Sequence, residues 1–400
     1  MTFFEELKWR GLVKDISSPD LEEKLNNESL TFYWGTDPTA DSLHLGHYSS
    51  LVTAKRLMLH GHKPILLVGG ATGLIGDPRP TAEREIISKE TVEKNIEGLK
   101  RQVTRLLDNK AEVVNNYDWT KNVTFLDFLR DIGKYINVNY MLNKDIISRR
   151  LESGITYAEF SYTLLQGFDF LHLFKNKNCT LQAAGSDQWG NITTGIELIR
   201  KIEGVEAYGF TMPLILDKTG KKFGKSEGNA LWLDKEKTSP YLIYQYLLNS
   251  DDSKVIEYLK VFTFLNKEEI DALEEKVKTE PEKREAQKTL AYEVVKDLHG
   301  VEEAEKAKKT SEEVFTKGYS SEGMPSETIE YKDNMNLMDI LVMTKITTSK
   351  SEARRLIIGN GISVNNEKEL NPERIFTKEE INDLIISKGK KTHIKVNLVK

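Results

Sequence analysis

The sequence predicts an α/β domain with a largely parallel sheet, followed by an α-helical domain and a small α+β module. In the first half of the chain, short strand-like apolar runs alternate with helical patterns. The next segment is highly charged and helical, and the last one combines two short helical patterns, a glycine turn and alternating strands. The predicted ranges are 1–238 for the α/β domain, 239–315 for the helical domain, 316–334 for a linker and 335–400 for the last module.

The predicted sheet contains five strand-like runs, at residues 30–35, 64–68, 111–116, 180–184 and 210–216. Between the second and third runs, apolar residues repeat at steps of three or four from Val92 to Leu106, which predicts a helix with one apolar face against the sheet. Glycines at residues 69–73 are expected to let the backbone approach a ligand closely. Ligands of such sheets bind at the carboxyl ends of the strands.

Composition excludes several classes of protein. Of the 400 residues, 39% are hydrophobic and 30% are charged, which is ordinary for a globular chain. No apolar run approaches the roughly 18 residues of a membrane span, and the N-terminus lacks the pattern of an export signal. The single cysteine, Cys179, rules out intrachain disulfides and a cysteine-based zinc cage. We therefore expect a cytoplasmic protein with no membrane segment.

Charge is spread unevenly along the chain. The net charge is −5, so the chain as a whole is not a basic nucleic-acid binder. Residues 331–400 carry 13 basic and 9 acidic residues, a net charge of +4, which leaves −9 for residues 1–330. The C-terminal module is therefore a candidate for binding a polyanion.

Two motifs indicate a polyphosphate site. His44-Leu45-Gly46-His47 follows a strand-like run and opens a helical stretch, where backbone N–H groups and imidazoles can face phosphates. The pair could instead cap a helix, and metal binding is disfavoured because no third ligand is spaced nearby. Lys222-Phe223-Gly224-Lys225-Ser226 is typical of a loop that closes over phosphates, although a solvated basic loop would look similar. Together the motifs favour ATP chemistry without a Walker-type loop.

Polar residues in two other segments indicate a small-ligand pocket. Tyr162, Gln166 and Asp169 fall at i, i+4 and i+7, on one face of an otherwise apolar helix. They form either a pocket wall or a satisfied buried hydrogen-bond network. After the strand at 180–184, Asp187 could accept ribose hydroxyls and Gln188 could reach a carbonyl or phosphate. The alternative for that segment is a helix N-cap by Ser186 or Asp187.

Together these motifs resemble the bacterial-type tyrosyl-tRNA synthetases, members of the class I aminoacyl-tRNA synthetases. The resemblance runs along the whole chain and rests on Tyr33 and on residues 37–47, 68–78, 115–119, 162–169, 185–191 and 222–226. Residues 349–357 and 361–365 look like the S4-type RNA-binding module of that family. The resemblance implies a Rossmann-like catalytic domain, a helical anticodon-region domain and an S4-like domain.

The resemblance also implies the reaction. The tyrosine carboxylate attacks the α-phosphorus of Mg·ATP in line to give tyrosyl-adenylate and pyrophosphate, and tyrosine then passes to the terminal ribose of tRNA(Tyr). The carboxylate is ionised near pH 7, so no general base is needed. ATP is a substrate that carries its own Mg²⁺, and no protein-bound metal is expected. The family further implies a homodimer across which one tRNA is shared.

For the amino acid, the resemblance implies six binding residues. The phenolic hydroxyl would be held by Tyr33 and Asp169, and the α-ammonium group by Asp77, Tyr162 and Gln166. Gln188 would lie near the carboxylate or the α-phosphate. Asn115-Asn116-Tyr117-Asp118-Trp119 belongs to the matching motifs without a role of its own.

For the nucleotide, the resemblance implies that Thr39 and His44 stabilise the departing pyrophosphate, with Gly46 and His47 on the nucleotide side. The ATP site would also include Gly35, Asp37, Gly185 and Asp187, and the closing loop would supply Lys222, Lys225 and Ser226. Two positions depart from the family. Trp34 replaces a small residue beside the ribose, and residues 77–84 lack a lysine, which leaves Arg84, with Arg79 second, as the basic candidate.

For tRNA, the candidate contacts are Lys350, Arg354, Arg355, Lys391 and Lys395. In the tail, Lys391, His393 and Lys395 alternate with apolar residues and would share one strand face, although an edge strand protected by lysines would look the same. Three other functions remain open. They are a tryptophanyl-tRNA synthetase-like enzyme, a cytidylyltransferase, which is normally shorter, and a non-catalytic RNA-binding paralogue.

Overall fold

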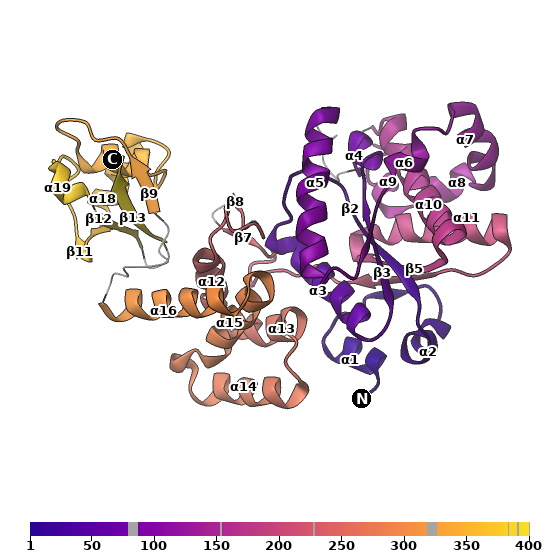
Figure 1. Ribbon diagram of the computed structural model, residues 1–400, viewed down its shortest axis with the longest axis horizontal. Helices are drawn as coiled ribbons and strands as arrows, with labels where there is room; N and C mark the ends of the chain where they lie inside the picture. The colour runs from indigo at the N-terminus through magenta and orange to yellow at the C-terminus, as the bar shows by residue number, and fades with distance from the viewer. Residues whose placement is uncertain are drawn as a thin grey trace. The chain divides into compact units, whose positions relative to one another are not determined.

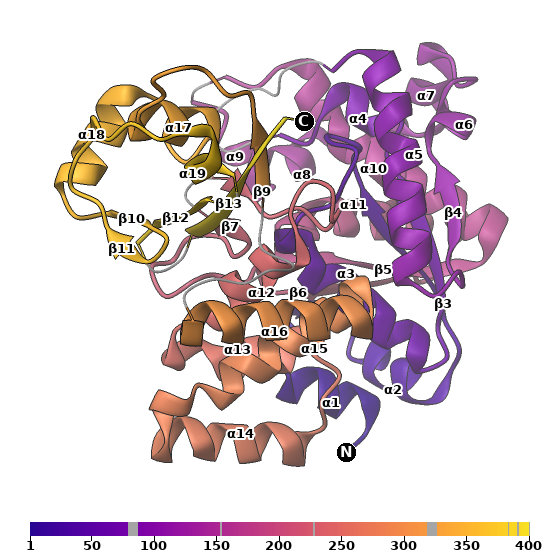
Figure 2. The same ribbon diagram turned by 60° about the vertical axis from the view of Figure 1, so that its left-hand side comes forward.

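The structure is a computed structural model that describes residues 1–78, 87–152, 154–226, 229–317, 326–382, 384–389 and 392–399. The chain forms two compact units (Figures 1 and 2). The first contains Met1–Asp234 and Glu257–Leu265, and the second contains Lys235–Ile256 and Asn266–Lys400. The predicted domain ranges, 1–238, 239–315, 316–334 and 335–400, stay predictions.

A six-stranded sheet forms the centre of the first unit, in the order β1-β6-β5-β2-β3-β4. Its strands are β1 (Asp15–Ile16), β2 (Thr31–Thr36), β3 (Lys63–Val68), β4 (Glu112–Asn115), β5 (Cys179–Gly185) and β6 (Tyr208–Met212). The five predicted strands are confirmed and are parallel to one another, although β6 is shorter than the predicted run. The two-residue β1, which the sequence did not indicate, is antiparallel to β6 at the edge.

Helices pack against this sheet and form its core. Side chains of β2 and β3, such as Tyr33 and Leu67, share one buried cluster with α10 (Tyr157–Lys177) and α11 (Trp189–Glu203). The helices α3 (Leu45–Leu59) and α5 (Lys89–Leu106) also pack on β3. The predicted apolar face of α5 is confirmed, because Val92, Leu99, Val103 and Leu106 are buried.

The strand order locates the ligand site. From β2 the chain proceeds through β3 and β4 to one edge, and then returns to place β5 on the other side of β2. Such a change of direction leaves a crevice at the carboxyl ends of the two central strands, where ligands of open α/β sheets bind. Here those ends lie at Thr36 of β2 and Gly185 of β5.

Short elements complete the first unit. They are α1 (Phe3–Trp9), α2 (Asp20–Asn27), α4 (Thr72–Ile75), α6 (Tyr117–Thr120), α7 (Phe125–Asp131), η1 (Gly133–Tyr135), α8 (Val138–Leu142), α9 (Asp145–Ser148), η2 (Ser186–Gln188), β7 (Lys225–Ser226) and β8 (Asn229–Ala230).

The predicted helical segment is confirmed. It comprises α12 (Pro240–Leu248), α13 (Asp252–Phe262), α14 (Lys267–Thr279), η3 (Pro281–Lys283), α15 (Glu285–His299) and α16 (Val301–Lys317). The first of these begins where the sequence signals it. The Ser239 hydroxyl accepts the Leu242 N–H at 3.3 Å, and Pro240 occupies the first turn, where its missing N–H is harmless. The carboxyl half of α13 belongs to the first unit.

The C-terminal module is a five-stranded sheet in the order β11-β10-β12-β13-β9 with three helices. Its elements are β9 (Ser326–Ile329), α17 (Leu337–Met343), α18 (Lys350–Ile358), β10 (Ile362–Val364), β11 (Glu367–Lys368), α19 (Lys378–Ile381), β12 (Leu384–Lys388) and β13 (Thr392–Leu398). Two expectations need correction. The predicted linker contains β9, which pairs with β13, and β13 has a strand on either side, so it is not an edge strand.

No helix in the described part of the chain is long and apolar enough to cross a membrane.

Candidate functional site

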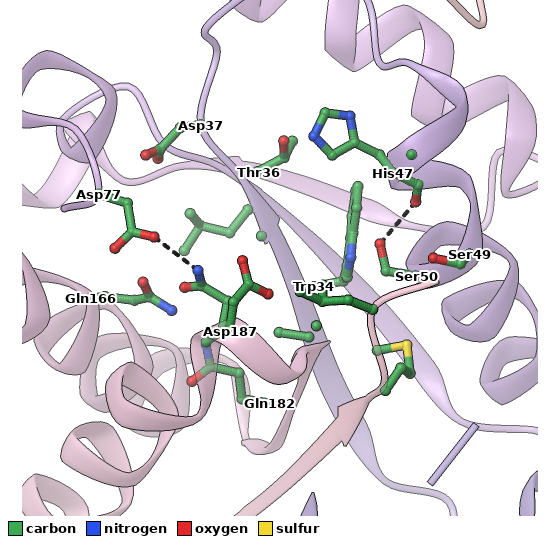
Figure 3. A pocket seen from close by; sticks show the side chains of 18 of the residues that line it. Trp34, Thr36, Asp37, His47, Ser49, Ser50, Asp77, Gln166, Gln182 and Asp187 are labelled. Atoms are coloured by element: carbon green, nitrogen blue, oxygen red, sulfur yellow. Dashed lines mark hydrogen bonds between the residues drawn. The ribbon is translucent and has the colours of Figure 1, made fainter. Parts of the chain in front are cut away.

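A cavity of about 400 Å³ opens at the carboxyl ends of β2 and β5 (Figure 3). It is lined by nearly all the residues that the sequence predicted for tyrosine and ATP. These are Tyr33, Gly35, Asp37, Thr39, His44, Gly46, His47, Asp77, Tyr162, Gln166, Asp169, Gly185, Asp187, Gln188 and Lys222. Segments more than 180 residues apart in the sequence therefore meet in one site.

Three predicted residues have side chains outside the described part of the structure. Arg84, like Arg79, lies outside the described residues altogether. Lys225 and Ser226 form the backbone of β7, but their side chains are not among those that the structure describes.

The deepest part of the cavity contains a buried carboxylate and a buried phenol. Asp169 is 2% exposed and accepts hydrogen bonds from Asn116 Nδ2 and Trp119 Nε1, both at 2.9 Å. Burial raises the pKa of Asp169 to about 7, and these two donors oppose the rise because they favour the carboxylate. The Tyr33 hydroxyl is buried without a hydrogen-bond partner among the described residues. An unpaired buried hydroxyl is costly, so a ligand group that bonds to it would be favoured here.

Two further carboxylates lie on the α10 side of the cavity. The Tyr162 hydroxyl donates to Asp37 Oδ2 at 2.9 Å, and Gln188 Nε2 donates to Asp77 Oδ2 at 3.0 Å. Figure 3 shows Asp37, Asp77 and Gln166 converging on this part of the cavity. Clustered carboxylates create a negative potential that suits a cation such as an α-ammonium group. Tyr162, Gln166 and Asp169 thus share the pocket wall that their helical spacing predicts.

Two histidines form the opposite end of the cavity. His44 is the N-cap of α3, its Nδ1 accepts the Gly46 N–H at 3.1 Å, and its ring stacks on His47 at 3.8 Å. The His47 Nδ1 in turn accepts the His44 N–H at 3.3 Å. Because a backbone N–H can only donate, each Nδ1 is unprotonated and the proton of each neutral ring lies on Nε2. Both imidazoles can therefore donate from Nε2.

His47 is uncharged at neutral pH. Loss of surrounding water, the neighbouring His44 and the positive charge of Lys222 lower the pKa of His47 to about 3. The motif thus caps a helix and lines the cavity at the same time, so the two interpretations of the sequence do not exclude each other.

The expectation that backbone N–H groups of this helix face phosphates is wrong. The Leu45 N–H donates to Leu231 O at 2.7 Å, and the His47 N–H donates to His44 O at 2.8 Å. The Gly46 N–H is already bonded to the His44 ring. The motif therefore faces the cavity with its two imidazole rings and not with free backbone N–H groups.

Lys222 reaches the cavity from a short hairpin. Its backbone bridges to Leu216, and the Phe223 N–H donates to Ile215 O at 3.0 Å. The following Gly224 has a φ of +88°, and a Cβ there would lie 2.5 Å from Gly46 N. The glycines of the two phosphate motifs therefore touch, and neither backbone could approach as closely with a side chain in between.

The part of the cavity expected to face the ribose contains the predicted carboxylate of Asp187 and the indole ring of Trp34. Asp187 is exposed on η2, and neither it nor Ser186 caps α11, whose N-cap position is occupied by Gln188. The capping alternative is therefore wrong, and Asp187 lines the cavity. Trp34, which is 4% exposed, stands between Asp187 and the helix that carries Ser50 and His47 (Figure 3). The indole gives this wall an apolar surface.

The glycines after β3 were expected to let the backbone approach a ligand, but they let it approach the protein's own side chains. A Cβ at Gly69 would lie 2.1 Å from Asp37 Oδ1, and one at Gly70 would lie 2.2 Å from Asn115 Oδ1. Neither glycine is among the described residues that line the cavity. They let the turn pack against the protein's own polar side chains, and so help to hold Asp37 in place.

Sequence reasoning missed several residues of the site. Gln182 lines the cavity from β5, directly beside Tyr33 in the sheet register, and its buried Oε1 has no hydrogen-bond partner within the described ranges. The available signal was a single amide within an apolar strand. Asn116 and Trp119 belong to a motif quoted for the resemblance, but their bonds to Asp169 join segments about 50 residues apart.

The candidate tRNA residues lie in the C-terminal module. Lys350 forms an ion pair with Asp339 at 2.6 Å, and Arg354 forms one with Glu373 at 3.1 Å. Arg355 is exposed on α18 and Lys395 lies on β13, while Lys391 is outside the described residues. Within the described ranges, no three histidine, cysteine or acidic side chains are grouped so that they could hold a metal ion.

Known sequences match this chain along nearly its whole length. The family described as tRNA synthetases class I (W and Y) matches residues 25–316, and the tyrosine–tRNA ligase SYY-like C-terminal domain matches residues 316–396. Tyrosine–tRNA ligase 1 of Bacillus subtilis is 46% identical, and the tyrosine–tRNA ligase of Bacillus pumilus is 48% identical. Each alignment covers 98% of this chain and 98% of its relative.

Solved structures share the fold. A C-terminally truncated mitochondrial tyrosyl-tRNA synthetase of Aspergillus nidulans is 32% identical, with a TM-score of 0.71 over 78% of this chain and 94% of that one. A tryptophanyl-tRNA synthetase of Encephalitozoon cuniculi is 15% identical, with a TM-score of 0.56 over 76% of this chain and 87% of that one, and shares the fold alone. The larger family takes in both kinds of enzyme, whereas the C-terminal family and the Bacillus relatives are tyrosine ligases. The chain therefore belongs to the tyrosine–tRNA ligases of the class I tRNA synthetase family.

Proposed function

We propose that this tyrosine–tRNA ligase binds L-tyrosine and ATP side by side in the cavity, forms tyrosyl-adenylate and pyrophosphate there, and then transfers tyrosine to the terminal ribose of tRNA(Tyr). One observation carries the proposal. A buried phenol and a buried carboxylate, Tyr33 and Asp169, lie in the same cavity as two stacked histidines and Lys222. The first pair suits a hydroxyl on an aromatic amino acid, and the second set suits phosphates.

The amino acid takes its orientation from hydrogen bonds at both ends. Its phenolic hydroxyl donates to Asp169 and meets the Tyr33 hydroxyl. The α-ammonium group bonds to Asp77, Tyr162 and Gln166, with Gln188 beside the carboxylate. Phenylalanine would leave the two buried groups unpaired, and tyrosyl-tRNA synthetases are themselves the known example of such a site, with a discrimination of about 10⁵. No editing domain is then needed.

Activation depends on positioning and on charge stabilisation. The ionised carboxylate attacks the α-phosphorus without a general base, so the protein needs only to hold it in line. As the bond to pyrophosphate breaks, negative charge grows on the leaving oxygens, where Thr39, the imidazole Nε2 atoms and Lys222 donate hydrogen bonds. Lys225, Ser226 and Arg84 complete this set. The ribose is held by Asp187 and Gly185, with Gly35, Asp37 and Gly46 on the nucleotide side, and Mg²⁺ arrives on ATP as part of the substrate.

The remaining partners follow from the family. The helical domain contacts the anticodon region, and the S4-like module binds tRNA through Arg355, Lys395 and neighbouring basic residues (Lys350, Arg354 and Lys391). Two copies form a homodimer. The enzyme acts in the cytoplasm, a reducing compartment in which a buried, unpaired cysteine such as Cys179 is ordinary.

Pyrophosphate–ATP exchange, assayed with each amino acid in turn, tests the proposal. Exchange with tyrosine alone is expected. Exchange with tryptophan and not tyrosine would point to the tryptophanyl alternative, and no exchange with any amino acid would point to a non-catalytic RNA-binding paralogue.

The His44→Ala variant tests the charge-stabilising role. Because the imidazole acts on phosphates at the far end of the cavity from the phenol, the variant should slow adenylate formation about a hundredfold. Tyrosine affinity, measured by equilibrium binding without ATP, should stay within about twofold. An equal loss in both measurements would contradict a role in the transition state.

A further inference from the structure

Four aromatic rings connect the two phosphate motifs to the end of α13. Phe223 of the lysine hairpin stacks on Phe262 of α13, with 4.6 Å between ring centres, and contacts Tyr258 at 4.7 Å. On its other side, Phe262 stacks on Tyr48 of α3 at 5.8 Å and an angle of 7°. Each of the four side chains is at most 4% exposed. Aromatic pairs at these distances favour particular ring orientations, so the cluster constrains direction as well as distance.

A hydrogen bond adds a second attachment to the same hairpin. The Tyr258 hydroxyl donates to Leu216 O at 3.0 Å, and Leu216 is the residue whose backbone bridges to Lys222. The hairpin is therefore held on both strands. Tyr258 holds the incoming strand through Leu216, and the ring pair holds the outgoing strand through Phe223.

The end of α13 is itself fixed by two buried arginines. Arg10 donates to Lys260 O at 3.0 Å and to Leu265 O at 2.7 Å. Arg56 of α3 donates to Val261 O at 3.3 Å and also to Thr263 O. The last carbonyl groups of a helix lack partners within the helix, and cationic donors there also complement the helix dipole. The arginines thus anchor Phe262 relative to α3.

We propose that Tyr258 and Phe262 are positioning residues for adenylate formation, which act by holding the hairpin so that Lys222 faces the phosphates of ATP. This inference rests on the proposed function. Neither side chain is among the described residues that line the cavity, so any effect on the reaction must pass through the residues that they contact, above all Leu216 and Phe223 of the hairpin. A ring stack and a hydrogen bond on opposite strands restrict both tilt and translation of the hairpin.

The Phe262→Leu variant removes the ring stack, and the Tyr258→Phe variant removes only the hydroxyl. The first should lower the rate of adenylate formation about tenfold, because a small displacement of a phosphate-binding group strongly affects an in-line reaction. The second should lower it less. Tyrosine binding without ATP should be unchanged in both, since the amino-acid end of the cavity does not involve α13.

A double-mutant cycle separates positioning from general stability. In a Lys222→Ala background, Phe262→Leu should cause no further loss of rate, because the group that it positions is gone. Phe4→Leu is the matched control, since Phe4 is fully buried on α1 and is not one of the four rings of the cluster. That variant should lower the unfolding temperature without changing the rate in the folded range.

The outcomes are distinct. If the wild-type protein shows no tyrosine-dependent exchange, the proposed function itself fails. If the wild type is active but Phe262→Leu retains the full rate, loses tyrosine affinity equally, or adds its loss to that of Lys222→Ala, the positioning inference is wrong and the cluster is only part of the core.

Discussion

The proposed selectivity of this site rests on individual polar atoms. The Tyr33 hydroxyl and Gln182 Oε1 are buried on neighbouring strands, in direct register, without partners among the described residues. Folding leaves such groups unpaired at a cost of about 1–3 kcal/mol each, which a ligand can recover when it binds. The stability that the ligand-free protein gives up at these atoms is therefore available as binding free energy to a ligand that bonds to them.

The cost of the unpaired Tyr33 hydroxyl predicts that Tyr33→Phe has opposite effects on the stability of the ligand-free protein and on tyrosine binding. Removing the unpaired hydroxyl should raise the free energy of unfolding of the ligand-free protein by about 1 kcal/mol. It should also lower kcat/KM for tyrosine about tenfold and reduce discrimination against phenylalanine, since one hydrogen bond to the substrate is lost. Urea unfolding and exchange kinetics measure the two effects.

Tyr241→Phe provides the matched control. The Tyr241 hydroxyl on α12 is also buried without a partner in the described part of the chain, but it lies outside the lining of the cavity. Its removal should stabilise the protein similarly and leave kcat/KM unchanged. Tyrosine affinity that is unaffected by Tyr33→Phe would contradict the assignment of the phenol-binding pair.

The protonation state of Asp169 predicts how tyrosine binding depends on pH. The pKa of Asp169 is raised to about 7, mainly by burial. A phenolic O–H donates to the carboxylate form, so binding should strengthen as Asp169 loses its proton. Tyrosine affinity should therefore rise about tenfold between about pH 6 and pH 8, and fall again at higher pH as the α-ammonium group of the ligand loses its proton.

Equilibrium binding without ATP isolates this effect, because no phosphate titrates. His47 also stays neutral across the range, since its pKa is about 3. The control ligand is 4-fluorophenylalanine, which lacks the hydroxyl and should show a much weaker rise. The same slope for both ligands would assign the pH dependence to another group.

The sequence reveals a site residue when its spacing in a local element carries the signal. Tyr162, Gln166 and Asp169 follow the helical period, so their shared wall can be predicted from the residues alone. Gln182 and Asn116 cannot be found in that way. Their roles depend on which strand lies beside β2 and on a bond between distant segments, and local periodicity contains neither fact.

Among the helices and strands, those that form only by pairing with a distant segment could not be predicted from the sequence. The five parallel strands lie in apolar runs that can be recognised, whereas β1 and β9 contain one apolar residue each and form by pairing with β6 and β13. The division of α13 between the two units is of the same kind. The part of α13 in the first unit accepts hydrogen bonds from Arg10 and Arg56, each about 200 or more residues away in the sequence.

The contact between α3 and the lysine hairpin makes a prediction for Gly224→Ala. The new Cβ would lie 2.5 Å from Gly46 N, and the φ of +88° is itself unfavourable for alanine. The hairpin must then move away from the histidines. Adenylate formation should fall about a hundredfold with tyrosine affinity retained.

Gly220→Ala separates steric displacement from backbone strain. Gly220 lies in the turn of the same hairpin at a φ of +81°, but a Cβ there would meet no described atom within 4 Å. It should therefore cost stability without a comparable loss of rate. Rapid-quench measurement of adenylate formation distinguishes the two variants, and equal rates would show that contact between the motifs is not required.

At the scale of the whole molecule, charge and exposed apolar surface point to the partners. Residues 331–400 carry a net charge of +4, and β13 lies inside a sheet, so the basic residues there do not serve to protect an edge. Apolar exposure is concentrated elsewhere. Of the exposed large apolar side chains in the described residues, several lie between residues 125 and 157, namely Phe125, Leu126, Leu129, Val138, Leu151 and Tyr157.

We expect this apolar region to form the interface of the proposed homodimer. Three of these residues lie on α7 and one on α8, both in the first unit, and Leu126 is 74% exposed. Exposed apolar surface of this kind suits burial between two copies of the chain. Leu126→Asp should therefore raise the dissociation constant of the dimer about a hundredfold or more, because two carboxylates would be buried at equivalent positions across the axis.

Sedimentation equilibrium over a range of concentrations measures the change, with Leu59→Asp as control, since Leu59 is 54% exposed at the end of α3. The Leu126→Asp monomer should still bind tyrosine, because neither α7 nor α8 supplies a described residue to the lining of the cavity. Transfer to tRNA should fall further than adenylate formation if one tRNA spans both subunits. A Leu126→Asp protein that stays dimeric would place the interface on another surface, while a monomer with full transfer activity would show that one chain suffices for both steps.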